Sequence, residues 1–189
     1  VLDDRIAEQL AIDISLSSAI QVRFGNSNAF NVTASTLIPL MRDHDMGGVY
    51  ICASVGAVER IEEFKSIGLS DEYISRIQFI DLVSSGILGG TDVEHSNIHF
   101  VYSPLMLESV LLRTLYILRV TTSVRYFVFL DSVNALAIYN DERMLAEYLH
   151  TFINTFRQRE VLSVILNVPD QTPPLVLATL DIYCTDLID

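Results

Sequence analysis

The residues best suited to chemistry follow a short apolar run, Ala19–Phe24, which predicts a β-strand. The run leads into a turn-rich stretch that begins at Gly25, and Thr33–Arg42 has the pattern of a helix. A strand, a glycine-led loop and a helix form the setting of a phosphate-binding loop, which reads Gly, four residues, then Gly-Lys-Ser/Thr. Taken without any family, the pattern indicates no more than a strand, a turn and a helix.

Three substitutions distinguish this loop from one that binds phosphate. Counted from Gly25, the positions of the second glycine, the lysine and the hydroxyl are occupied by Phe30, Asn31 and Val32. Phe30 places a side chain where the backbone must approach the phosphates, Asn31 carries no charge, and Val32 cannot hold a cation. We therefore expect a loop of this kind to bind ATP weakly or not at all.

A second candidate is the apolar run Phe127–Leu130, which is followed by Asp131 and Ser132. Four apolar residues and an aspartate at a strand end describe a Walker B element, in which Asp131 would hold the hydration shell of Mg²⁺. Apolar strands often end in aspartate, so Asp131 is also explained as a capping or turn residue. The two interpretations predict different surroundings for the carboxylate.

A third strand end reads Cys52-Ala53-Ser54-Val55. An ATPase of this layout places a glutamate there as the base that activates water. The nearest acid, Glu59, falls inside the helix that follows. The sequence therefore shows no evident general base at this position.

Short β-rich runs alternate with amphipathic segments along the chain, which predicts a mainly parallel sheet with helices on both faces. Asn140 is expected to cap the helix after it, Ser103-Pro104 to start a helix, and Ser84–Asn97 to form a long loop. The expected strands are 19–24, 49–53, 77–82, 126–130 and 161–168, and the expected helices are 2–10, 33–42, 58–67, 70–76, 105–120 and 145–159.

Composition limits the class of protein. A chain of 189 residues predicts one domain, and 50% hydrophobic residues with a mean hydropathy of +0.38 fit strands buried on both faces or an oligomer interface. The net charge of −12 and the scattered basic residues disfavour direct nucleic-acid binding. The apolar runs are too short for a membrane span. We expect Cys52 and Cys184 to be buried free thiols in strand-like segments. Free thiols favour a reducing compartment and therefore a cytoplasmic location.

The order of these segments resembles the KaiC-type branch of the RecA-like ATPases, common in archaea. The resemblance covers about Ser17 to Leu187 and depends on GGVYICASVGAVERIEEFKSIGL (47–69), RIQFIDL (76–82), YFVFLDSVNAL (126–136), the helix and strand after 145, and Leu180-Asp181-Ile182 as a late strand. It implies a single RecA-like domain, with the family's last strands absent or shortened. It also implies ATP bound between subunits of rings or filaments, with Gly25 as the first loop glycine and Asp131-Ser132 as the Walker B pair.

The departures from the family lead to one hypothesis and two alternatives. The main hypothesis is a pseudo-ATPase that binds no cofactor and acts in regulation or protein interaction, with itself or an active RecA-like paralogue as the partner. The first alternative is an atypical switch that binds ATP and Mg²⁺, the latter at Asp131, through a Lys or Arg recruited from elsewhere. The second is an accessory protein of a recombinase-type DNA-repair complex.

Overall fold

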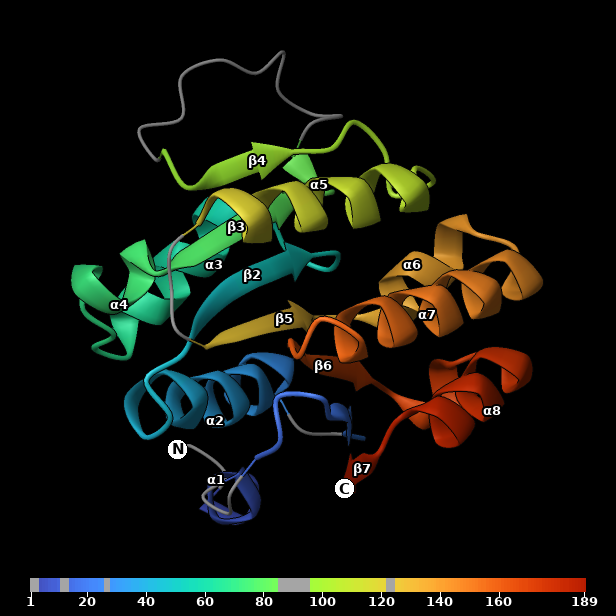
Figure 1. The fold of residues 1–189 in the computed structure, drawn as a ribbon, viewed down its shortest axis with the longest axis horizontal. Helices are drawn as coiled ribbons and strands as arrows, with labels where there is room; N and C mark the ends of the chain where they lie inside the picture. The colour runs from blue at the N-terminus through green and yellow to red at the C-terminus, as the bar shows by residue number, and fades with distance from the viewer. Residues whose placement is uncertain (1–3, 11–13, 26–27, 85–95, 122–124) are drawn as a thin grey trace.

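The structure is a computed structural model of the chain. It describes residues 4–10, 14–25, 28–84, 96–121 and 125–189. Their arrangement is a single central sheet with helices on both faces (Figure 1).

The sheet has seven strands in the order β4-β3-β2-β5-β6-β1-β7, and every pair of neighbours is parallel. All residues of β2 and β6 are buried, which explains the high apolar content. The expected parallel sheet is thus confirmed. The strands are β1 (Ala19–Arg23), β2 (Gly47–Cys52), β3 (Ile77–Asp81), β4 (Ile98–Phe100), β5 (Tyr126–Leu130), β6 (Leu162–Asn167) and β7 (Asp186–Ile188).

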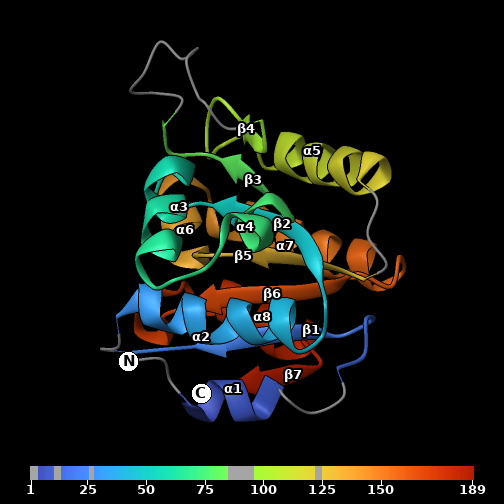
Figure 2. The same cartoon turned by 90° about the vertical axis from the view of Figure 1, so that its left-hand side faces the viewer.

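Helices form a layer on each face of the sheet (Figures 1 and 2). Apolar side chains of α1 to α4 pack on one face, and those of α5 to α8 pack on the other. The helices are α1 (Asp4–Leu10), α2 (Ala29–Arg42), α3 (Ala57–Ser66), α4 (Asp71–Ser75), α5 (Leu107–Val120), α6 (Val133–Tyr139), α7 (Glu142–Arg157) and α8 (Pro174–Tyr183), with a 3₁₀ turn at Pro169–Gln171.

Three helix starts differ from those expected. Helix α2 begins at Ala29 rather than Thr33, because the side chain of Asn28 accepts a hydrogen bond from the Phe30 amide and caps the helix. Asn140 ends α6, and Asp141 is the residue that caps α7. Helix α5 begins at Leu107, so Ser103-Pro104 lies in the turn before it.

The C-terminal segment also differs from expectation. Leu180-Asp181-Ile182 is helical, because Val176, Thr179 and Leu180 of α8 bury one helix face, chiefly against α7. The last strand, β7, comes later and pairs with β1. Cys52 lies in β2 as expected, whereas Cys184 follows α8, and both thiols are unpaired.

A short strand, β4, was not expected. It follows the predicted loop Ser84–Asn97, of which residues 85–95 lie outside the described part of the chain. Three residues are too few to show the alternation that identifies a strand in a sequence.

Strands β2 and β5 approach closely at Gly48, which is paired with Phe127. A Cβ atom at position 48 would lie 2.1 Å from the Phe127 carbonyl oxygen. That separation is far below van der Waals contact, so only glycine fits between these two central strands.

We predict that Gly48→Ala lowers the free energy of unfolding by about 3 kcal/mol, because the strands must separate to admit a methyl group. Gly25→Ala is the matched control, since an added Cβ there would meet no described heavy atom within 4 Å. We expect the control to change stability by less than about 1 kcal/mol. Urea unfolding of both variants measures the difference, and equal losses would contradict the argument.

Candidate functional site

Because all strands are parallel, their carboxyl ends lie at one edge of the sheet. Strand β2 leads into α3 on one face, whereas β5 leads into α6 on the other. Parallel sheets usually bind ligands where neighbouring strands send their helices to opposite faces. One such point lies between the ends of β2 and β5, where Asp131 is found, and another lies between the ends of β6 and β1.

The Asp131 carboxylate is buried and bound on both oxygens. Oδ1 accepts hydrogen bonds from the backbone amides of Ala53 at 2.8 Å and Ser54 at 3.2 Å. Oδ2 accepts one from the Ser54 hydroxyl at 2.9 Å, and the Tyr50 hydroxyl lies 3.5 Å away. Asp131 therefore joins the end of β5 to the loop that follows β2.

Arg60 of α3 supplies the counter-charge for this carboxylate. Its Nη2 atom lies 3.6 Å from Asp131 Oδ2, and both side chains are almost fully buried. Its Nη1 atom donates a 2.7 Å hydrogen bond to Glu63. The guanidinium also lies over the rings of Phe30 and Tyr50, at 5.7 and 5.8 Å from their centroids. Arg60 is thus enclosed by two acids and two aromatic rings.

The electrostatics follow from burial and pairing. Burial raises the pKa of Asp131, while Arg60 and the donors of Ala53 and Ser54 lower it part of the way back. Burial lowers the pKa of Arg60, but Tyr50, Asp131 and other acidic groups outweigh that effect and hold it above its usual value. The guanidinium therefore stays charged at any physiological pH.

The loop residues selected from the sequence reach the same cluster through Phe30. Phe30 and Asn31 lie in the first turn of α2, and Val32 is buried in the core beneath it. The Phe30 ring packs 5.9 Å from Phe64 and covers the Arg60 guanidinium. Gly25 is exposed after β1, two positions beyond Arg23, whose guanidinium pairs with Asp181.

Two further expectations concern residues beside Asp131. Ser132 caps α6, because its Oγ accepts a hydrogen bond from the Ala135 amide at 3.0 Å. Ser54, which with Val55 stands where the resemblance implies a glutamate, donates hydrogen bonds to Asp131 from its amide and its hydroxyl. The structure thus brings Asp131 and Ser54 together, and it links Phe30 to them through Arg60.

Sequence reasoning did not select Arg60, although the sequence contains a signal for it. In α3 the buried residues are Ala57, Arg60, Ile61 and Phe64, a helical spacing of three, four and seven. An arginine on the apolar face of a helix must be buried, and a buried arginine needs an acidic partner. That requirement calls for an acid nearby but does not distinguish Asp81 at the end of β3 from Asp131 after β5.

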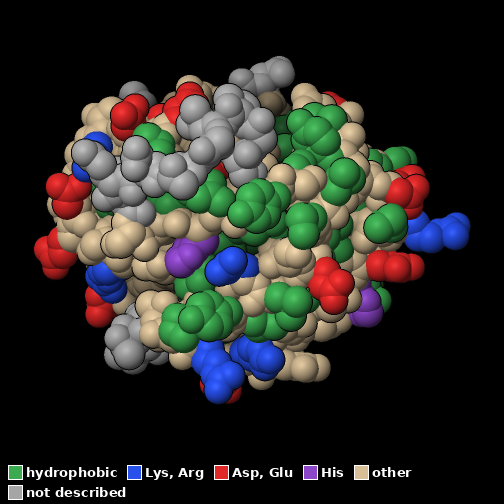
Figure 3. Space-filling view, turned by 90° about the horizontal axis from the view of Figure 1, so that it is seen from above, with side chains coloured by type: hydrophobic (Ala, Val, Ile, Leu, Met, Phe, Trp, Pro, Cys, Tyr) green, Lys and Arg blue, Asp and Glu red, His purple; other side chains and the backbone are tan. Residues whose placement is uncertain are grey.

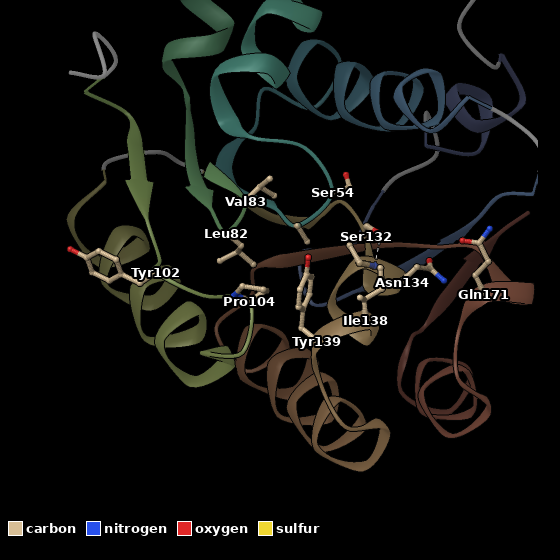
Figure 4. Close-up of a pocket in the computed structure, with 12 residues that line it drawn as sticks. Ser54, Leu82, Val83, Tyr102, Pro104, Ser132, Asn134, Ile138, Tyr139 and Gln171 are labelled. Carbon is tan, nitrogen blue, oxygen red and sulfur yellow. Dashed lines mark hydrogen bonds between the residues drawn. The ribbon is translucent and has the colours of Figure 1, made fainter. Parts of the chain in front are cut away.

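A groove opens on the solvent side of these strand ends (Figure 4). Its volume is about 680 Å³. The labelled side chains come from the loops after β2, β3 and β4, from Ser132 and α6, and from Gln171. Ile138 and Tyr139 belong to α6, Pro104 lies beside Tyr139, and Tyr102 lies beyond Pro104. We call this cavity the switch-point groove.

The part of the chain that the structure describes contains neither a candidate metal cluster nor a membrane-spanning helix. No group of three or more His, Cys, Asp or Glu side chains within the described ranges is placed to hold a metal ion. No described helix is both long enough and apolar enough to cross a membrane.

Comparison with known proteins gives the fold but no sequence family. No protein-family model and no curated protein match the chain. Among solved structures, the flagellar accessory protein FlaH from Methanocaldococcus jannaschii superposes with a TM-score of 0.66 at 14% identity, covering 98% of this chain and 75% of FlaH. The KaiC-like protein PH0186 from Pyrococcus horikoshii OT3 gives 0.60 at 15% identity, covering 90% of this chain and 71% of PH0186.

These neighbours confirm the resemblance found in the sequence at the level of architecture. Both share the parallel sheet with helices on its two faces over nearly the whole of this chain. The chain has the RecA-like α/β fold of the KaiC-like proteins.

Proposed function

We propose that this chain is a RecA-like pseudo-ATPase, in which the fold is kept as a regulatory or protein-interaction module. The observation that carries the proposal is the buried pair of Arg60 and Asp131. In the family pattern, the aspartate at this strand end faces Mg²⁺. Here a cation of the protein itself takes the place of the metal.

The residues present do not fit ATP with Mg²⁺. Both oxygens of Asp131 already accept hydrogen bonds, and its side chain is 1% exposed. Phe30 lies where a phosphate-binding loop has glycine, and its ring covers Arg60. Asn31 and Val32 supply neither the charge nor the hydroxyl that phosphates and Mg²⁺ require. Asp131, Phe30 and Val32 therefore have other tasks in this protein, as a buried ion-pair partner, a cover for Arg60 and a core residue.

One observation favours a second candidate, an atypical nucleotide-binding switch. Such a switch needs a cation near the glycine-led loop, and Arg60 lies directly beneath Phe30 of α2. To reach a phosphate, Arg60 would have to leave Asp131 and Glu63, and Phe30 would have to move. The pseudo-ATPase requires no such rearrangement, so we favour it.

The proposed role is that of an accessory protein with a protein partner, either a second copy or an active RecA-like paralogue. One neighbour in the structural comparison, FlaH, is itself described as a flagellar accessory protein. The high apolar content and the exposed apolar side chains around the switch-point groove support a role in interaction.

We predict that millimolar ATP or ADP with Mg²⁺ leaves the thermal unfolding of the protein unchanged. A ligand at 100 times its Kd stabilises the native state by about 2.7 kcal/mol, which a thermal shift would reveal. Titration calorimetry with the same nucleotides provides an independent measurement. Clear stabilisation would favour the nucleotide-binding switch, and Arg60→Met would then show whether Arg60 is the recruited cation.

A further prediction concerns the ion pair itself. Arg60→Met leaves Asp131 buried without a counter-charge, and we expect it to lower the free energy of unfolding at neutral pH by about 3 kcal/mol. The matched control is Arg76→Met, which removes an exposed pair with Asp45 and should cost less than about 1 kcal/mol.

The cost of Arg60→Met should grow with pH. Without Arg60 the pKa of folded Asp131 rises further above that of the unfolded chain, so the native state binds more protons between the two values. Stability then falls as the pH rises through that interval. Urea unfolding at pH 4.5 and 7.5 tests this, and a cost that is equal at both pH values would show that the pair carries no such charge coupling.

A further inference from the structure

The switch-point groove is bordered by large apolar side chains that the protein leaves exposed. Tyr102 is 83% exposed, Ile138 77% and Tyr139 55%, and Leu105 and Met106 are also exposed. The Asn140 side chain donates a hydrogen bond to the Pro104 carbonyl at 3.0 Å. This bond holds the turn before α5 beside the end of α6, so the two groups form one apolar border.

The lining of the groove favours an uncharged ligand. All twelve of the residues that line it are uncharged, in a chain with 24 acidic and 12 basic residues. The hydroxyl of Ser132 and the amide of Asn134 are engaged within the protein, with α6 and with Val168 and Thr172. A phosphate or carboxylate would find no cation among these lining residues, whereas aliphatic and aromatic groups would find apolar contacts.

The surroundings of the groove are acidic. Glu108, Asp141 and Asp170 are exposed, and in the chain they lie two positions after Met106, two after Tyr139 and one before Gln171. The exposed Arg143 is a neighbouring base. Figure 3 views the molecule from above and shows many apolar side chains at the surface, with acidic side chains towards the right and with Lys or Arg at the centre, at the lower edge and at the far right. An apolar groove with an acidic border complements an apolar anchor flanked by Lys or Arg.

We infer that the switch-point groove is the docking site for a segment of a partner protein that inserts aliphatic or aromatic anchors and carries Lys or Arg beside them. The inference rests on the interaction role proposed above and gives it a surface and a partner chemistry. It is tested apart from nucleotide binding, because Arg60 and Phe30 do not line the groove, although Ser54 and Ser132 beside Asp131 do.

A second copy of the chain is a poorer occupant. Each copy carries a net charge of −12, so two copies repel each other. Several of its cations are already paired within the chain: Arg23 with Asp181, Lys65 with Asp71, and Arg76 with Asp45. A separate protein with free Lys or Arg side chains meets the acidic border without this repulsion.

A phage-displayed library of random 16-residue peptides tests the inference on the whole chain. We expect the enriched peptides to carry a large apolar residue next to Lys or Arg. Ile138→Lys should weaken the selected peptides at least tenfold. Ile182→Lys is the matched control, since Ile182 is 71% exposed near the end of α8 and does not line the groove, and it should change affinity less than twofold.

The charge of the border is tested separately. In the double variant Glu108→Gln/Asp170→Asn, the selected peptides should bind more weakly and with less dependence on salt concentration. Urea unfolding establishes that each variant is folded.

Three results would overturn the inference. They are a library without enrichment, enriched peptides that bind Ile138→Lys as well as the unaltered protein, and a dimer that Ile138→Lys dissociates. The last result would assign the groove to a second copy. Absence of nucleotide binding would leave the inference standing, and nucleotide binding would overturn only the pseudo-ATPase.

Discussion

The carboxylate of Asp131 must be neutralised inside the sheet, and much of the surrounding structure follows from that requirement. A buried charge is tolerated only with a partner and with hydrogen bonds on its remaining lone pairs. Arg60 is the charged partner, and the backbone amides of Ala53 and Ser54 donate the hydrogen bonds. Arg60 in turn needs cover from water, which Phe30 and Tyr50 supply.

This chain of requirements explains why the proposed loss of ATP chemistry involves several distant residues together. A metal-free aspartate at the end of β5 needs a cation, and the arginine that supplies it needs aromatic neighbours. Phe30, which is unsuited to a phosphate-binding loop, is well suited to cover a guanidinium. Phe30, Ser54, Arg60 and Asp131 are therefore best understood as one packed arrangement.

The sequence was sufficient to predict the architecture. Apolar runs identified the five longer strands, and their alternation with helices predicted the parallel sheet that the structure confirms. The starts of the helices were harder to predict from the sequence. Asn28 and Asp141 cap α2 and α7 through their side chains, but several polar residues near each start could have done the same. The short strands β4 and β7 have only three residues each and therefore no recognisable period.

The candidate site was predicted only in part, for a physical reason. Asp131 and Ser54 could be found because strand ends gather at one edge of a parallel sheet. The pairing of Arg60 with Asp131 joins residues 71 positions apart, and no local pattern encodes such a contact. The apolar border of the groove could not be predicted, because residues such as Tyr102 and Ile138 are usually buried and only the fold shows that they are exposed here.

The connection between β2 and α3 is tied at both ends by acids from neighbouring strands. Asp131 holds Ala53 and Ser54, while Asp81 at the end of β3 accepts a 2.8 Å hydrogen bond from the Ala57 amide, the first residue of α3. The length of this connection is therefore fixed. An added or deleted residue would pull one end from its anchor, so homologous chains that keep both aspartates should keep its length as well.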